Sequence, residues 1–193
     1  MKDMLQFATT LALVTLISAG SLAWINRITK PKILAQREKK FNEGLFTVLP
    51  GIQEGLVVPI EENDETFYYE GYRDTNKTDF IGYAFLAQPR GYSSTIETLV
   101  GVDSVGTILG IKILSQRETP GLGTRCEETR SGETGPWWQV QFSGKKVVEI
   151  EIDKDGGQIE SITGATITSR AITHGIAERA NSIFRKINNL SRE

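Results

Sequence analysis

Cysteine and histidine are almost absent from this sequence of 193 residues, which has one of each, Cys126 and His174. A single cysteine forms no internal disulfide and supplies no thiolate cluster. The chain therefore cannot hold an iron–sulfur cluster by itself, and we expect no metal site. His174 lies near the C-terminus within an apolar-periodic stretch, where we expect packing or surface exposure rather than catalysis.

A strong excess of charge of either sign is also lacking. The 22 Lys and Arg residues nearly balance the 24 Asp and Glu residues, which leaves a net charge of −2. A basic surface for nucleic acid is therefore not expected, and we predict no nucleic-acid partner. There is no low-complexity segment and no internal repeat, and the length suits one domain with an appendage.

Charge is missing altogether from residues 4–25, which consist mainly of Leu, Ala, Val, Ile and Thr. A bilayer core about 30 Å thick is crossed by about 20 helical residues, so this run is long enough to span a membrane. Trp24 falls where indole rings favour the interface. A cleaved signal peptide is the alternative, because Ala19 and Ser21 are small enough to flank a cleavage site. The run continues to Ile25, which favours an uncleaved anchor.

Basic residues flank this apolar run unequally. Lys2 precedes it, and six basic residues follow it: Arg27, Lys30, Lys32, Arg37, Lys39 and Lys40. Counting Lys and Arg alone would place the C-terminal domain in the cytoplasm.

A helix is predicted from Pro31, as a first-turn proline, to Pro50-Gly51, where turn residues end it. Its apolar face is formed by Leu34, Phe41, Leu45, Val48 and Leu49.

Short strands are predicted where β-branched and aromatic residues cluster between turn residues. Their ranges are 80–88, 96–102, 107–114, 139–142 and 147–152, with shorter strands around 67–72. Residues 103–106 and 143–145 are predicted turns. A helix, several antiparallel strands and a closing helix predict an α+β domain.

The closing helix is predicted after Ser169, where apolar residues recur at intervals of three and four. Before it lies a segment rich in hydroxyl groups, residues 161–169. A helix start exposes unpaired N–H groups and suits a phosphate. The alternative is an ordinary helix start capped by Thr168 or Ser169, with Gly164 making the turn. The lysine and glycine spacing of a nucleotide P-loop are absent.

Residues 118–123, Glu-Thr-Pro-Gly-Leu-Gly, follow the third of the predicted strands. Pro120-Gly121 favours a type II turn, in which glycine takes the positive φ. Gly123 removes another side chain, so a flat ligand could approach the backbone closely. A purely structural turn would also explain this segment.

These motifs together resemble a known family. Residues 163–168, Thr-Gly-Ala-Thr-Ile-Thr, resemble the S/T-G-A-T-x-S/T signature of proteins that carry FMN covalently. Glu-Thr-Pro-Gly-Leu-Gly after a strand is similar to a second family motif, and related segments at 91–96 and 99–103 precede it in the family's order. The chain resembles the G subunit of the Rnf electron-transport complex over nearly its whole length.

The resemblance implies a flavin site. A flavin transferase would join FMN through a phosphoester to Thr166. The family's pattern carries Asp where this chain has Glu160, which could alter recognition by the transferase. Besides Thr166, the residues expected to bind the cofactor are Thr163, Gly164, Ala165, Thr168, Ser169, Glu118, Thr119, Gly121, Leu122 and Gly123. Hydroxyl groups of Thr168 and Ser169 would bond phosphate oxygens, and the polar side chains of Glu118 and Thr119 would bond the edge of the ring.

The resemblance further implies a single-pass protein of the inner membrane, with its C-terminal domain on the periplasmic side. We expect residues 1–27 to form the cytoplasmic tip and anchor, 28–79 a linker helix and the start of the domain, and 80–193 the FMN-binding core. The predicted partners are other membrane subunits, the transferase and membrane lipid. The subunit would carry electrons within a complex that links ferredoxin oxidation and NAD reduction to the movement of Na⁺ or H⁺, without a soluble substrate of its own.

Three other functions remain open. One is the C subunit of the sodium-pumping NADH:quinone oxidoreductase, a cousin of the same family that usually carries extra sequence. Another is a membrane-anchored assembly or binding module without a cofactor. The third is an exported hydrolase with Thr166 or a neighbouring serine as nucleophile, although no Ser/His/Asp arrangement is visible.

Overall fold

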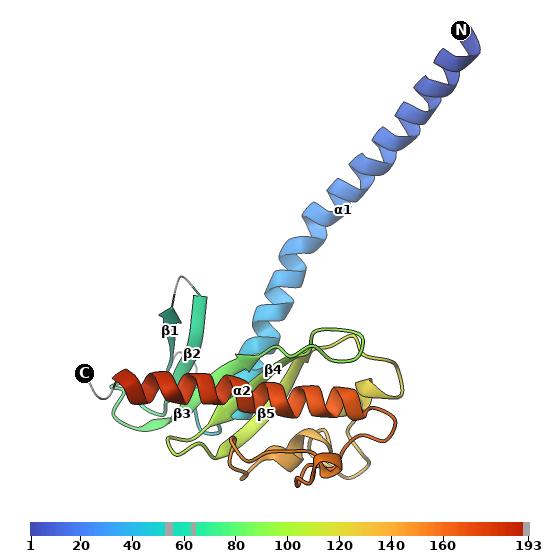
Figure 1. Cartoon of the computed structure of the whole chain (residues 1–193). Coiled ribbons are helices and arrows are strands. Elements are labelled where there is room, and N and C mark those ends of the chain that lie inside the picture. The colour runs from blue at the N-terminus through green and yellow to red at the C-terminus, as the bar shows by residue number, and fades with distance from the viewer. Residues whose placement is uncertain (53–55, 63–64, 191–193) are drawn as a thin grey trace. The chain divides into compact units, whose positions relative to one another are not determined.

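The structure is a computed structural model that describes residues 1–52, 56–62 and 65–190. Within these residues it has two long helices, five strands and three short 3₁₀ helices (Figure 1). In chain order these are α1 (Lys2–Val48), β1 (Val57–Glu62), β2 (Glu65–Tyr72), β3 (Phe80–Ala87), β4 (Glu97–Val102), β5 (Ile108–Ser115), η1 (Gly123–Glu127), η2 (Gln139–Phe142), η3 (Asp153–Asp155) and α2 (Thr166–Leu190). The strands form one antiparallel sheet in the order β1-β2-β3-β4-β5, which confirms the predicted α+β class.

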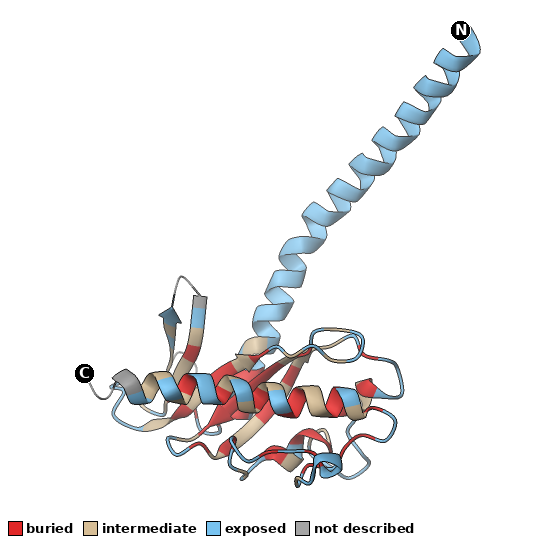
Figure 2. Ribbon diagram, in the orientation of Figure 1, coloured by how far each residue is buried: buried red, intermediate tan, exposed pale blue. Residues whose placement is uncertain are grey.

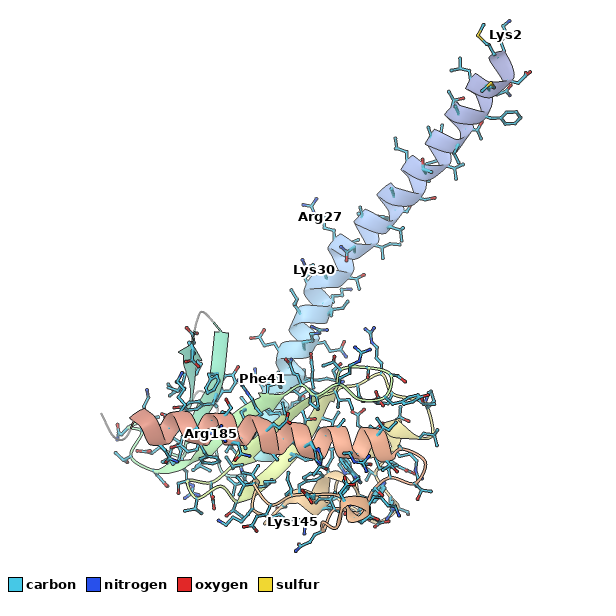
Figure 3. The ribbon with its side chains drawn as sticks, viewed as in Figure 1. Lys2, Arg27, Lys30, Phe41, Lys145 and Arg185 are labelled. Carbon is cyan, nitrogen blue, oxygen red and sulfur yellow. The ribbon has the colours of Figure 1, made fainter. Side chains whose placement is uncertain are left out.

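The chain divides into two compact units, residues 1–40 and 41–193. The first unit is the N-terminal part of α1, and all of its side chains are exposed (Figure 2). No lysine or arginine lies between Lys2 and Arg27, both labelled in Figure 3. By length and composition this helix can cross a membrane.

The prediction that a separate helix starts at Pro31 is wrong, because α1 runs through this residue without a break. A proline inside a helix removes one backbone donor and crowds the preceding turn. Its neighbours in residues 30–40 are mainly Lys, Leu, Ala, Gln, Arg and Glu, which favour helix and keep it continuous. The predicted end is confirmed, since α1 stops at Val48 and Gly51 follows with φ +89°.

In the second unit, the last turns of α1 cover one face of the sheet. Leu45 and Val48 are buried there in a cluster with Leu99 of β4. Gly101 of β4 allows this close approach, because a Cβ at this position would overlap the backbone carbonyl of Val48. The other face carries the larger core, in which Ile176 of α2 packs with residues of β3, β4 and β5. Figure 1 shows α2 lying across the sheet.

Two predicted strands are absent from the described structure. Residues 139–142 form η2, and residues 147–152 contain only an isolated bridge between Ile152 and Ile159. In the second segment Val147, Ile150 and Ile152 are buried, while the residues between them are exposed. The pattern of apolar residues therefore reports burial against the core and not hydrogen bonding to a neighbouring strand.

The predicted turn at 103–106 is confirmed between β4 and β5. Gly106 has φ +78°, and its N–H donates to the carbonyl of Asp103 over 3.2 Å. The turn at 143–145 also forms, with Gly144 at φ +78°, but it follows η2 and does not join two strands. The strand expected around 67–72 is part of β2.

Candidate functional site

The two sequence motifs meet in space at the N-terminal end of α2. A cavity of about 500 Å³ opens there between three stretches of chain, residues 91–96, 118–123 and 161–168, here called the cavity segments. The cavity is lined by Tyr92, Glu118, Thr119, Leu122, Gly123, Gly164, Ala165, Thr166, Ile167 and Thr168. Three of the predicted cofactor residues, Thr163, Ser169 and Gly121, lie outside this lining.

Two lining residues, Tyr92 and Ile167, were not among the predicted cofactor residues. Both lie within the family motifs, but nothing else in the sequence indicates that their side chains line a cavity. Tyr92 is exposed by 67%, Ile167 by 53% and Leu122 by 41%. Together these three residues form an apolar rim around the cavity, which suits a flat, largely apolar ligand.

The backbone turns sharply just before α2. The N–H of Ala165 donates to the carbonyl of Ile162 over 2.8 Å, and Gly164 takes φ +78°. Helix α2 then begins at Thr166. The alternative in which Thr168 or Ser169 caps the helix is therefore wrong, because both residues lie inside its first turn.

The hydroxyl groups of this motif have different surroundings. Ser169 is buried, and its Oγ accepts from the N–H of Ile162 (3.0 Å) and donates to the carbonyl of Ala165 (3.1 Å). Thr168 is also buried, and its Oγ1 donates to Glu118 over 2.7 Å. Thr166 is half-buried and lines the cavity. Its hydroxyl makes no hydrogen bond with any residue that the structure describes.

Glu118 lies at the centre of the cavity segments with 5% of its surface exposed. Its Oε1 accepts from the N–H groups of Ser93 and Ser94, both over 3.0 Å, and from Ser94 Oγ over 2.9 Å. Its Oε2 accepts from the N–H of Tyr92 over 3.0 Å and from Thr168 Oγ1 over 2.7 Å. Burial alone would raise the pKa of this carboxyl, but the hydrogen bonds from Thr168, Ser93 and Ser94 outweigh it and lower the pKa.

The turn at 119–122 has the predicted geometry. The N–H of Leu122 donates to the carbonyl of Thr119 over 3.1 Å, and Gly121 has φ +74°. Gly123 is required for a different reason. A Cβ there would lie 2.6 Å from Glu118 Cβ and 2.9 Å from Thr168 Oγ1, so only glycine lets this segment pack against the start of α2.

Side chains from outside the cavity fix the chain just ahead of the motif. Trp138 Nε1 donates to the carbonyl of Glu160, whose N–H donates to Gln141 Oε1, both over 2.8 Å. The backbone of Glu160 is thus held on both sides. Its carboxylate lies on an exposed residue, and recognition of that carboxylate by a transferase stays a prediction.

The only arginine in the first turn and a half of α2, Arg170, is paired away from the cavity. Its Nε and one terminal nitrogen donate to the two carboxylate oxygens of Asp155 over 2.6 and 2.7 Å. This hydrogen-bonded pair lowers the pKa of Asp155 and raises that of Arg170. An anion in the cavity would therefore meet backbone N–H groups and the helix dipole, with no cationic side chain in the lining.

The two rare residues lie away from this chemistry. His174 lines a separate groove with Pro89 and Arg90. Cys126 is buried, and burial raises the pKa of its thiol to about 12, so it stays protonated. Among the described residues, no group of three or more His, Cys, Asp or Glu side chains could hold a metal ion.

Comparison with known proteins gives two family matches. The model of the FMN-binding domain matches residues 91–181, which include all three cavity segments. The model of the RnfG N-terminal region matches residues 1–48, which correspond to α1.

Two relatives named as G subunits agree with these matches. The G subunit of the ion-translocating oxidoreductase complex from Shewanella piezotolerans is 31% identical over 91% of this chain and 87% of its own length. The protein of the same name from Pasteurella multocida is 32% identical over 94% of both chains. The crystal structure of Shewanella oneidensis NqrC superimposes with a TM-score of 0.46 at 17% identity, over 69% of this chain and 66% of that one.

The family matches and the two G-subunit relatives confirm the resemblance and support the predicted role, a membrane-anchored flavoprotein subunit that transfers electrons. Its relatives are subunits of a larger complex, so other subunits are its expected partners. The chain belongs to the family of G subunits of the ion-translocating oxidoreductase complex, and residues 91–181 are its FMN-binding domain.

Proposed function

We propose that this chain carries electrons through an FMN joined covalently, by a phosphoester, to Thr166. The observation that supports this assignment is the difference between the hydroxyl groups at the start of α2. The hydroxyls of Thr168 and Ser169 donate hydrogen bonds to other protein atoms. The hydroxyl of Thr166 lines the cavity and makes no hydrogen bond with the described residues.

Amide groups are the proposed ligands of the phosphate. The first N–H groups of a helix have no partner inside it, and the helix dipole favours an anion at this end. A phosphoester that links threonine to FMN carries a single negative charge, which these groups can stabilise without a lysine or arginine.

The hydroxyl groups of Thr168 and Ser169 are less suited to the phosphate role predicted for them. Each hydroxyl has one proton, and the structure gives those protons to Glu118 and to the carbonyl of Ala165. We therefore assign these two residues to the support of the site. Thr163 is exposed and outside the cavity lining, so we place it in the turn that presents Thr166.

The isoalloxazine ring is proposed to lie against the apolar rim of Tyr92, Leu122 and Ile167. Gly164, Ala165 and Gly123 leave room for it, and Thr119 also lines the cavity. FMN supplies the redox chemistry when bound, and the protein positions it and tunes its surroundings. The open rim would allow close approach of cofactors in partner subunits of the complex.

The alternatives receive less support. Both the RnfG N-terminal match and the two relatives named as G subunits favour the Rnf type over the C subunit of the quinone reductase. The FMN-binding match argues against a module without a cofactor. A hydrolase would need a base near Thr166, and His174 lines a different groove.

We propose that the domain faces the periplasm, with α1 as an uncleaved anchor and residues 1–27 forming the cytoplasmic tip and membrane span. A reporter enzyme fused after Ser191 tests this orientation. A periplasmic reporter such as alkaline phosphatase should be active in the fusion. Activity of a cytoplasmic reporter at the same position would overturn the assignment.

Covalent attachment is tested by flavin fluorescence in a denaturing gel. The full chain is expressed together with a flavin transferase, and Thr166→Ala is compared with Thr163→Ala, a matched threonine three residues away. We expect a fluorescent band for the wild type and for Thr163→Ala, and none for Thr166→Ala. Intact mass should show one added FMN in the wild type and in Thr163→Ala, and an unmodified chain in Thr166→Ala. A band that survives in Thr166→Ala would overturn the proposal.

A further inference from the structure

Glu118 joins the three cavity segments through a single carboxylate. It belongs to the segment after β5, accepts three N–H bonds from the loop between β3 and β4, and accepts the hydroxyl of Thr168 in α2. The side chain of Glu118 thus connects residues 92–94 with Thr168. These partners lie 24 to 50 positions from Glu118 in the sequence. The shape of the cavity depends on this residue.

The carboxylate has little capacity left for a ligand. Its two oxygens accept five hydrogen bonds in total, three at Oε1 and two at Oε2. An ionised carboxylate offers about four lone-pair sites and no proton. Direct bonding of Glu118 to the edge of the ring, which the family resemblance implies, would therefore displace donors that already hold the loop.

The charge of Glu118 is compensated only by neutral groups. All five donors are backbone N–H or hydroxyl groups, and no described Lys, Arg or His forms an ion pair with this residue. Charges act more strongly where burial lowers the effective dielectric constant. A fixed negative charge in the cavity wall opposes the gain of further negative charge by anything bound there.

We infer that Glu118 is a positioning residue whose buried charge also lowers the reduction potential of the bound flavin. This inference rests on the proposed function, because it needs FMN in the cavity. It assigns Glu118 to the support and electrostatics of the site and leaves binding of the ring to the apolar rim and the phosphate to the start of α2.

The test is a spectroelectrochemical titration of the covalently loaded full chain at pH 7. In Glu118→Gln the side chain keeps its size and loses its charge, so the midpoint potential should become more positive than in the wild type. In Thr168→Val one hydrogen bond is lost while the charge remains, so the potential should stay the same or become more negative. Thr168→Ser restores the hydroxyl and should return the potential to the wild-type value.

A shift to a more positive potential in Glu118→Gln but not in Thr168→Val separates a charge effect from general disruption. Loosening of the cavity would move the potentials of Glu118→Gln and Thr168→Val in the same direction. The inference is overturned if that happens, or if Glu118→Gln leaves the potential unchanged.

A further variant covers the case in which Glu118→Gln fails to fold or to load flavin. Ser94→Ala removes another donor to the carboxylate and keeps its charge. Its potential should shift as that of Thr168→Val does, and a shift of both to more positive values would refute the charge effect. A wild-type protein without covalent flavin would refute the proposed function itself, which gel fluorescence detects before any titration.

Discussion

The apolar side chains of α1 and α2 have opposite surroundings. In residues 4–25 of α1 they are all exposed, whereas in α2 Ile172, Ile176 and Ile183 are buried against the sheet (Figure 2). Exposure of so many apolar side chains to water is unfavourable, whereas the hydrocarbon core of a bilayer accommodates them. The second arrangement is that of a helix in a water-soluble domain.

The hydroxyl groups of the two helices also have different hydrogen-bond partners. In the apolar run of α1 the hydroxyls of Thr9, Thr10 and Thr15 donate to carbonyls of their own helix, three or four residues earlier. At the start of α2 the hydroxyl of Thr168 reaches Glu118, and that of Ser169 accepts from the turn before the helix. The sheet and its loops bring other groups within reach of α2, so a site forms there.

Removal of residues 1–27 should have the largest effect of the changes considered, because it should abolish membrane association. We expect the shortened chain to leave the membrane fraction and appear in the soluble fraction, because the apolar run that prefers hydrocarbon is gone. Sedimentation after cell lysis, followed by detection of the chain in both fractions, measures this. A shortened chain that is still held in the membrane would show that other parts of the protein bind lipid or a membrane subunit.

Matched isoleucines in the two helices come next. Ile176 is fully buried in α2, and Ile17 is 59% exposed in α1. Ile176→Ala should lower the free energy of unfolding of the domain by about 2–5 kcal/mol, because it removes buried methyl groups and leaves a cavity. Ile17→Ala should change it by less than about 0.5 kcal/mol.

Denaturant unfolding of the full chain in detergent, monitored by near-UV circular dichroism, gives both values. Equal losses in the two variants would mean that the two apolar surfaces have the same role in the domain, which the burial of these residues does not support.

Matched glycines give a smaller contrast. Gly123→Ala places a Cβ against Glu118 and Thr168 and should destabilise the domain by about 1–3 kcal/mol through overpacking. Gly20→Ala meets nothing within 4 Å and should leave the domain unchanged. Thermal unfolding of the two variants tests this, and a stable Gly123→Ala protein with wild-type flavin loading would show that the cavity wall adapts.

Acid should affect the domain and spare the apolar run of α1, which has no titratable group. The pKa of Glu118 is lowered from its ordinary value of 4.5 in the folded protein, so its contribution to stability is complete above pH 4.5. That contribution is lost as the pH falls below 4.5 through the lowered pKa. The difference in unfolding free energy between the wild type and Glu118→Gln should therefore shrink over this range.

Urea titrations at several pH values measure that difference. The carboxyls of Asp74, Asp153 and Asp155 also have lowered pKa values, and they are present in both proteins. Their effects cancel in the comparison. A difference that stays constant as the pH falls well below 4.5 would show that ionisation of Glu118 does not contribute to stability.

Much of the fold follows from local patterns in the sequence. Three of the strands, β3, β4 and β5, and the turn at 103–106 lie where alternation and turn residues predict them. Residues 139–142 and 147–152 have the composition of strands and still form none, because their apolar residues pack on the core without a strand beside them. Pro31 predicted a helix start that its helix-favouring neighbours override.

The sequence by itself determined the apolar run of the anchor, the α+β class and the two motifs, because each depends on residues that are close along the chain. Only the tertiary structure decided which hydroxyl at the start of α2 stays unbonded, because its neighbours Thr168 and Ser169 are engaged by groups up to 50 positions away. The tertiary structure likewise decided that the carboxylate of Glu118 accepts five hydrogen bonds from the protein itself. Hydrogen bonds of this kind arise from the packing of the sheet, the loops and α2, which no local pattern encodes.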